Sequence, residues 1–308
     1  MVTRAALVTG AGGFIGAALA ERLVAAGWEV HATDAAFDAP TRARLKGARL
    51  TEAPLQTALA DMGALRPAAV VHAAAVTASP AELGQSRAAH VCANSALTLA
   101  ALEWARAAGA GRFVFLSSSG VFGDAAPGMT AVDERSPATA SDPYSAAKRA
   151  GEILLAGAAE PGFETLSLRL GPVFGPHEAA RPSRPRLSLV ARMIAEARAH
   201  RTITLTTPEA RRDWTFLPDL ARAVAALLTQ EAVQGLLHLT SGQVLSDRAL
   251  AEAIAALMPG AKVIGAPDAS APPPRPPMVS AAPLPDMRWT DLATALRSIL
   301  QPQGEPAA

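Results

Sequence analysis

The sequence has a single cysteine, nearly balanced charge and no long apolar run, and each of these scarcities excludes a class of protein. Because Cys92 stands alone, neither an intrachain disulfide nor a thiolate metal cluster can form, and we expect no metal site. Lys and Arg number 28 against 27 Asp and Glu, which provides no basic surface for nucleic acid or an anionic membrane. No apolar run reaches the roughly 18 residues of a membrane span.

The chain does have ample apolar material for a core. Half of its 308 residues are hydrophobic and 18% are charged, which favours one large α/β unit with an appendage, or two lobes. Residues 1–4 lead directly into a strand-like segment and show no secretory signal. We therefore expect a cytoplasmic protein.

The first half of the chain alternates short apolar runs with helical patterns. We expect strands at 5–9, 28–34, 69–75, 112–117 and 165–170, and helices at 14–26, 87–108 and 144–158. Strands that alternate with helices form a parallel sheet covered on both faces through right-handed crossovers. The predicted fold class is therefore α/β, with a Rossmann-type doubly wound parallel sheet.

The pattern changes after Gly175. The Pro/Arg segment 181–186 predicts a loop. After it we expect a helix near 187–199, a short strand at 202–205 and a helix at 220–229. The proline-rich segment 267–285 predicts a surface loop or extended chain rather than a ligand for a partner. We expect a larger sheet domain over 1–175, to which 212–240 return, and a smaller C-terminal substrate-binding lobe over 176–308.

Three glycines, Gly10, Gly13 and Gly16, lie between the first strand and the first helix at a G-x-x-G-x-x-G spacing. Glycines there permit a tight turn, close approach of a pyrophosphate and close helix–sheet packing, while the helix N-terminus offers N–H groups to phosphates. A glycine triplet alone is a weak signal. Here it has the strand–turn–helix context that dinucleotide binding requires.

An acid follows at the expected distance. Asp34 closes the second strand 18 residues after Gly16, near the spacing of about 20 seen in dinucleotide sites. Its carboxylate would accept hydrogen bonds from ribose hydroxyls and repel a 2′-phosphate. The next arginine, Arg42, is not obviously placed for such a phosphate, so we expect NAD rather than NADP. The alternative is that Asp34 only caps a loop.

Tyr144 is the only tyrosine, and Lys148 follows it by one helical turn on the same face. A free tyrosine has a pKa near 10, and a neighbouring ammonium with a positive nicotinamide ring would favour phenolate. Lowering that pKa by about three units requires roughly 4 kcal/mol. The pair predicts a general base. The alternative is a half-buried tyrosine beside a solvated lysine.

The buried strand 112–117 ends in hydroxyl residues, Ser117, Ser118 and Ser119. They would lie at the carboxyl edge of the sheet, where ligands of open α/β sheets bind. A serine there can hydrogen-bond a substrate hydroxyl that is losing its proton, although serines also begin ordinary loops. The order glycine turn, serines, Tyr-x-x-x-Lys makes coincidence improbable.

Together these motifs resemble the extended short-chain dehydrogenases/reductases of the NAD-dependent epimerase/dehydratase family. The resemblance runs from residue 7 to about 224, and the tail after Leu236 matches only loosely. The matching segments are 10–16, Asp34, 72–75, Asn94, 117–123, 144–148, 169–176 and 211–214.

The resemblance implies roles for individual residues. Tyr144 would be the general base and acid, Lys148 its partner, and Ser118 the substrate-side hydroxyl, with Ser119 as the fallback. Asn94 would bridge the catalytic helix through water or serve as a structural cap. The implied NAD contacts are Gly10, Gly13, Phe14, Ile15, Gly16, Asp34, Ala73, Ala74, Ala75, Asn94, Tyr144 and Lys148. The implied substrate contacts are Thr77, Ser118, Ser119, Arg184 and Arg212, with Arg212 on a diphosphate.

Departures from the family pattern narrow the activity. Ser119-Gly120 stands where sugar 4,6-dehydratases carry Asp-Glu, and Gly120 stands where sugar-acid decarboxylases carry Glu. Pro172 replaces the asparagine of many nucleotide-sugar enzymes. Thr51-Glu52-Ala53 stands where members place an adenine-binding aspartate.

The family resemblance, Arg212 and the arginines of 181–186 favour a nucleotide-sugar 4-epimerase-like enzyme with NAD, in which the loop would clamp a diphosphate. That loop can equally be a solvated lid. Pro172 and the short second lobe motivate an alternative, an NAD-dependent dehydrogenase of a free sugar or sugar acid. A third possibility is a dinucleotide sensor without turnover, which would have no need of the Ser118–Tyr144–Lys148 set.

The family also implies a homodimer in which the helices 87–108 and 144–158 of two copies form a four-helix bundle. The sequence itself provides only their apolar faces, which can equally be intramolecular core.

Overall fold

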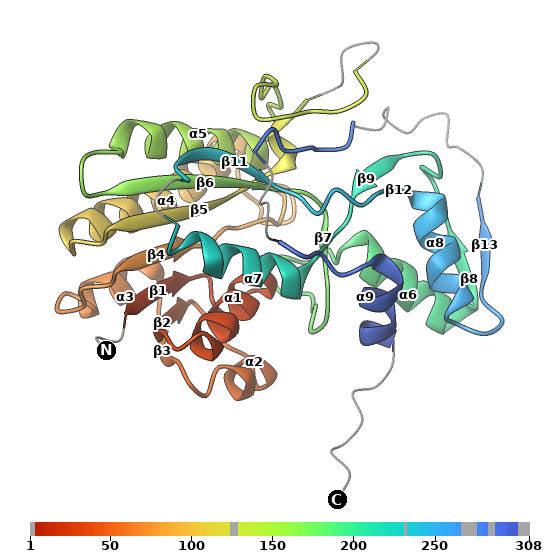
Figure 1. Ribbon diagram of the computed structural model, residues 1–308, viewed down its shortest axis with the longest axis horizontal. Helices are drawn as coiled ribbons and strands as arrows, with labels where there is room; N and C mark the ends of the chain where they lie inside the picture. The colour runs from red at the N-terminus through yellow and green to blue at the C-terminus, as the bar shows by residue number, and fades with distance from the viewer. Residues whose placement is uncertain (1–3, 124–128, 231–232, 266–275, 283–286, 301–308) are drawn as a thin grey trace, which may run out of the picture.

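The structure is a computed structural model that describes residues 4–123, 129–230, 233–265, 276–282 and 287–300. Its main sheet has seven strands, all parallel, in the order β11-β6-β5-β4-β1-β2-β3 (Figure 1). This confirms the predicted Rossmann-type α/β fold. The strands are β1 (Ala5–Thr9), β2 (Glu29–Asp34), β3 (Arg49–Glu52), β4 (Ala69–His72), β5 (Arg112–Ser118), β6 (Glu164–Leu170) and β11 (Gly235–Leu239).

Helices cover both faces of this sheet because its strands are apolar on both sides. On β1, Ala6 and Val8 belong to one core cluster and Leu7 to the other, as the alternation of a strand requires. The first cluster includes side chains of α1 (Phe14–Ala25) and α7 (Leu217–Leu227). The second includes side chains of α3 (Leu55–Asp61), α4 (Arg87–Ala107) and α5 (Pro143–Ala158). The short helix α2 (Ala39–Arg44) follows β2.

A smaller lobe beside the carboxyl edge of the sheet has a core of its own (Figure 1). Trp214 and Phe174 are among its largest buried side chains. Its small sheets pair β10 with β7, β12 with β9 and β13 with β8. The elements are β7 (Val173–Phe174), α6 (Leu189–His200), β8 (Thr202–Thr204), β9 (Arg211–Asp213), β10 (Thr215–Phe216), β12 (Val244–Ser246), α8 (Asp247–Ala256), β13 (Lys262–Ile264) and α9 (Leu292–Leu300).

The chain returns to the main sheet after the first part of this lobe. Helix α7 packs against α1, and β11 pairs with β6 along its whole length. The predicted division at 175 with a return over 212–240 stays a prediction. Most of the proline-rich segment 267–285 lies outside the described residues, and in its described part Met278 is buried and pairs with Val132.

Two predicted elements differ most from the observed bounds. The strand predicted over 69–75 ends at His72, opposite Thr9, where its neighbour β1 also ends. The helix predicted over 220–229 begins at Leu217, since Pro218 is tolerated in the first turn, where its missing N–H has no partner to lose. No described helix is long and apolar enough to cross a membrane.

Helix α5 approaches β5 unusually closely at Gly151. A methyl group there would lie 2.5 Å from Cζ of Phe115, which is fully buried under the helix. This contact fixes the height of α5 above the strand, and α5 carries both Tyr144 and Lys148. The position of the two residues over the end of β5 therefore depends on a missing side chain at Gly151.

We predict opposite effects for two alanine substitutions in α5. Gly157 has no neighbour within 4 Å of an added methyl group, so Gly157→Ala should stabilise the protein by up to about 1 kcal/mol through helix propensity. Gly151→Ala should destabilise it by about 1–3 kcal/mol because the methyl group overpacks Phe115. Denaturant unfolding of both variants measures the difference. A Gly151→Ala protein as stable as Gly157→Ala would show that the contact is not tight.

Candidate active site

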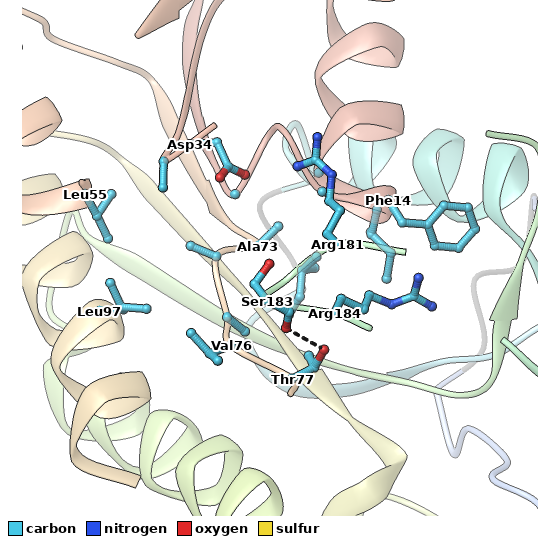
Figure 2. A pocket seen from close by; sticks show the side chains of 18 of the residues that line it. Phe14, Asp34, Leu55, Ala73, Val76, Thr77, Leu97, Arg181, Ser183 and Arg184 are labelled. Atoms are coloured by element: carbon cyan, nitrogen blue, oxygen red, sulfur yellow. Dashed lines mark hydrogen bonds between the residues drawn. The ribbon is translucent and has the colours of Figure 1, made fainter. Parts of the chain in front are cut away.

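A cavity of about 320 Å³ opens at the carboxyl edge of the sheet, where the strand order reverses between β1 and β4. Thirteen of the predicted site residues line it: Gly10, Gly13, Phe14, Ile15, Gly16, Asp34, Ala73, Ala74, Ala75, Thr77, Tyr144, Lys148 and Arg184. Four others, Asn94, Ser118, Ser119 and Arg212, are not in this lining. Figure 2 shows Asp34 toward one side of the cavity and Phe14 with Arg184 toward the other.

At two positions of the glycine turn, Gly10 and Gly16, the backbone leaves no room for a side chain. Gly10 has φ +69°, and a methyl group there would lie 2.5 Å from the backbone N of Ala74. A methyl group on Gly16 would overlap the carbonyl oxygen of Gly10. Gly13 caps α1 without a side-chain bond, so backbone N–H groups at the start of the helix stay available to an anion. The turn fits a pyrophosphate.

Asp34 completes the part of the cavity that suits an adenosine ribose. Its carboxylate accepts hydrogen bonds from the backbone N of Gly12 at 2.9 Å and of Ala36 at 3.4 Å, which hold it beside the turn. Arg42, the next arginine in sequence, is ion-paired with Glu52 and stacks on Phe37. The next arginine after Asp34 is therefore already paired and does not offer a site for the 2′-phosphate of NADP, as expected for a cavity that takes NAD.

Asn94 supports the cavity from behind. Its Oδ1 accepts from the backbone N of Val76 at 2.8 Å, and its Nδ2 donates to the carbonyl oxygens of Val76 and His90, both at 3.2 Å. The residue is buried on α4 and holds the loop that follows β4. These bonds are those of a structural amide, and the water bridge from Asn94 to the catalytic helix stays a prediction.

Ser118, Tyr144 and Lys148 meet where β5 ends and α5 begins. Asp142 caps α5 by accepting a hydrogen bond from the backbone N of Ser145, and Pro143 is the first residue of the helix. Tyr144 therefore lies in the first turn of α5. The hydroxyl of Ser118 lies near the Tyr144 ring, on the other side of Gly120, and lowers the pKa of the phenol. Nζ of the buried Lys148 donates to the carbonyl oxygen of Leu116 at 2.7 Å.

The electrostatics of this trio differ from the expectation in one respect. Burial raises the pKa of Tyr144 above its ordinary value of 10.0, and the nearby Ser118 hydroxyl and the charge of Arg184 oppose that rise only in part. Burial lowers the pKa of Lys148 to about 8, against the opposing charge of Glu152. The chain alone therefore does not lower the phenol pKa. Of the two cations that we expected to favour phenolate, only the positive nicotinamide ring of bound NAD is left to lower the phenol pKa.

The predicted substrate arginines have different surroundings. Arg184 pairs with the buried Glu178 at 2.5 Å and stacks over Phe14, 5.2 Å from the ring centroid. Within the described residues its Nη1 is buried and has no hydrogen-bond partner. Arg212 instead binds both carboxylate oxygens of Asp247, at 2.7 and 3.0 Å.

Sequence reasoning placed Arg181 only within a loop that would clamp a diphosphate, and it missed Ser183 and Glu152. Arg181 and Ser183 line the cavity, with Arg181 on the side of Asp34 (Figure 2). Glu152 accepts from the hydroxyl of Ser117 at 2.6 Å and from Arg169 at 2.8 Å. Its position one turn after Lys148 on α5 was the signal that could have identified it.

No metal centre is found in the described part of the chain, where no three His, Cys, Asp or Glu side chains come close enough to hold an ion.

Comparisons with known proteins agree with this geometry. The model of the "NAD dependent epimerase/dehydratase family" matches residues 6–237. A curated dTDP-glucose 4,6-dehydratase from Streptomyces niveus is 31% identical over 187 residues, 60% of this chain. The matched part spans about half of that relative, 53% of its length.

Solved structures match over nearly the whole chain. A UDP-glucose 4-epimerase from Thermus thermophilus, in complex with NAD, is 26% identical, with a TM-score of 0.78 and coverage of 96% of this chain and 97% of the other. An epimerase from Methanothermobacter thermautotrophicus has a TM-score of 0.80 at 23% identity, covers 96% and 91%, and supports the fold alone. The chain therefore belongs to the NAD-dependent epimerase/dehydratase family and is an NAD-dependent enzyme of the extended short-chain dehydrogenase/reductase type.

Proposed function

We propose that this enzyme is a nucleotide-sugar 4-epimerase that oxidises a secondary hydroxyl of its substrate and reduces the resulting ketone from the other face. The observation that carries the proposal is that Tyr144 and Lys148 line the same cavity as Asp34 and the glycine turn, with Ser118 close to the phenol. One cavity thus joins a proton-transfer group to a dinucleotide cradle.

Each residue of the trio has a distinct task. The Tyr144 phenolate accepts the proton of the substrate hydroxyl, and Ser118 orients that hydroxyl through its own. The Lys148 ammonium, mostly protonated below pH 8, adds positive charge beneath the phenol. Bound NAD supplies the hydride acceptor. Gly10, Gly13 and Gly16 would hold its pyrophosphate, and Asp34 its adenosine ribose.

Arg184 is the residue that we assign to the anionic part of the substrate. It lines the cavity, and its buried Nη1 has no partner among the described residues. An unpaired guanidinium N–H is a strong donor to a phosphate oxygen. Its charge also lowers the pKa of Tyr144, so the same residue favours phenolate.

The residues after Ser118 support epimerisation over elimination. Gly120 lies against the hydroxyls of Ser118 and Ser145, 3.2 and 3.4 Å from an added methyl group, and carries no acid. Among the described lining residues, the only carboxylate is Asp34, beside the glycine turn. A 4,6-dehydration needs an acid and a base near the sugar, so similarity to the Streptomyces dehydratase does not carry over to its reaction.

One observation favours the second candidate, an NAD-dependent dehydrogenase of a free sugar or sugar acid. Arg212 pairs with Asp247 through Nε and Nη2 and does not line the cavity. The described lining contains Arg181 and Arg184, and only Arg184 lies away from Asp34. A single arginine suits a carboxylate as well as a diphosphate. The two candidates differ in the fate of the reduced cofactor.

The phenolate absorbance of the whole protein should report on Tyr144 alone, because it is the only tyrosine. Without cofactor we expect a titration midpoint above the ordinary value of 10.0, since burial raises the pKa. NAD should lower that midpoint by about 3 units, because the nicotinamide cation favours the charged phenolate. Ultraviolet difference titration measures both values, with Tyr144→Phe as the blank. A midpoint that NAD leaves unchanged contradicts the proposed base.

An activity assay with UDP-glucose and NAD separates the candidates. An epimerase converts the sugar to its C4 epimer with no net NADH, whereas a dehydrogenase forms NADH in proportion to a free sugar acid such as galacturonate. Tyr144→Phe should lower kcat by about 10²- to 10⁴-fold through loss of the base, with NAD binding retained. Full turnover by that variant would exclude the mechanism.

The same assay tests Arg184 against a neighbour. Arg184→Met should raise KM for the nucleotide sugar more than it lowers kcat. Arg186→Met is the matched control, because Arg186 is exposed, pairs with Glu82 and does not line the cavity. Equal KM values for the two variants would remove Arg184 from the substrate site.

We further propose a homodimer through α4 and α5, which pack against each other on one face of the sheet (Figure 1). Ile153 on α5 is 71% exposed and Leu99 on α4 is 45% exposed, a surface that a second copy would cover. Sedimentation velocity should show a dimer for the wild type and a monomer for Ile153→Asp. Ile264→Asp, at another exposed apolar residue, on β13, should remain dimeric. A dimer that survives Ile153→Asp places the interface elsewhere.

A further inference from the structure

We infer that Arg181 latches the segment 178–186 across the NAD cleft and that this latch sets the rate at which the cofactor leaves. We call this segment the strap. The inference rests on the proposed function only in taking NAD as the ligand of the cavity. It assigns to Arg181 a role at the adenosine end of the cofactor.

The strap is a defined turn. The backbone N of Arg181 donates to the carbonyl oxygen of Arg184 at 3.0 Å, and the N of Arg184 donates back to Arg181 at 2.9 Å. The buried Glu178 fixes the two ends together, because it accepts from Nη2 of Arg184 at 2.5 Å and from the N and Oγ of Ser188, both at 2.6 Å. The turn therefore moves as one piece.

One side of the strap is bound to the loop after β4. The carbonyl oxygen of Ser183 accepts from the backbone N of Thr77 at 2.9 Å, from the N of Ala78 at 3.0 Å and from Oγ1 of Thr77 at 3.2 Å (Figure 2). Thr77 and Ser183 both line the cavity. The strap is thus bound to the side of the cavity that the loop after β4 forms.

The other side is bound to the loop after β2, through Arg181 alone. Nη2 of Arg181 pairs with Asp38 at 3.1 Å, and Nη1 donates to the carbonyl oxygen of Ala36 at 3.5 Å. The guanidinium also lies over the glycine turn, since a methyl group on Gly12 would be 2.9 Å from Nη1 and 2.9 Å from Cγ of Asp34. Arg181 therefore closes the strap beside the acid that suits the ribose.

The ion pair between Arg181 and Asp38 is charged at neutral pH and exposed enough to break. Asp38 is ionised at neutral pH, because hydrogen bonds from Thr41 and the charge of Arg181 hold its pKa below 3.8. The Asp38 side chain is 45% exposed and that of Arg181 19%, so water screens the pair in part. A cofactor beneath the strap can leave only after this pair or the Ser183 contacts separate, because the strap joins both banks of the cleft.

The experiment measures NADH release from the purified enzyme, displaced by excess NAD and followed by cofactor fluorescence. Arg181→Ala and Asp38→Asn each remove the ion pair, and asparagine keeps an oxygen for the α2 cap on Thr41. Each variant should release NADH about two- to fivefold faster than the wild type, the range expected for a partly exposed pair. The double variant should be no faster than the faster single variant, because both changes break one interaction.

Arg49→Ala is the control, since it removes an exposed ion pair with Glu29 outside the strap and outside the cavity lining, and its release rate should equal that of the wild type. Wild-type release from both single variants overturns the inference. Acceleration by Arg181→Ala alone also overturns it, because it makes Arg181 a direct cofactor contact and not a latch. If the wild-type protein binds no NADH, the proposed cofactor site is wrong. If it binds NADH and the variants release it at the wild-type rate, only the inference about Arg181 is wrong.

Discussion

The hydrogen bond from Lys148 to the carbonyl oxygen of Leu116, 2.7 Å long, ties α5 to the last residues of β5. It brings the buried ammonium 4.7 Å from the centroid of the Phe115 ring and 5.7 Å from that of Tyr144. A buried ammonium without such partners would be neutral, because desolvation disfavours its charge. The contact between Gly151 and Phe115 makes the bond possible by letting the helix come close enough. The arrangement of Tyr144 and Lys148 therefore depends on backbone packing as much as on the two side chains themselves.

A second layer of charge lies behind Lys148. Glu152 and Arg169 form a buried pair joined by two bonds of 2.8 Å, and Ser117 donates to the same carboxylate at 2.6 Å. Pairs of this kind contribute little net stability, since burial of both charges costs about as much as their attraction supplies. This pair does connect α5, β5 and β6, and the carboxylate supports the charge of Lys148. Its contribution is to hold three elements in register beside Lys148.

Local patterns predicted most of the fold and the inner part of the site. The glycine turn, Asp34 and the Tyr144–Lys148 pair are set by the geometry of one turn, one strand end and one helix face, so spacing along the chain is enough to find them. Arg212 shows the limit of such reasoning. Its partner Asp247 lies 35 residues away on α8, and only the folded lobe brings the two together. Arg181 likewise pairs with Asp38, 143 residues distant. Side-chain pairs between remote segments depend on tertiary contacts that no local spacing encodes.

The turn Arg181–Arg184 places one arginine at each end of the cavity, Arg181 beside Asp34 and Arg184 beside Phe14 and Tyr144. The two guanidinium groups are joined by a tight backbone turn, so neither can shift far alone. If Arg184 binds the substrate anion as proposed, a force on that guanidinium is passed through the backbone turn to the residue that contacts Asp38. The substrate end and the adenosine end of the cavity are therefore joined by four consecutive residues of the chain.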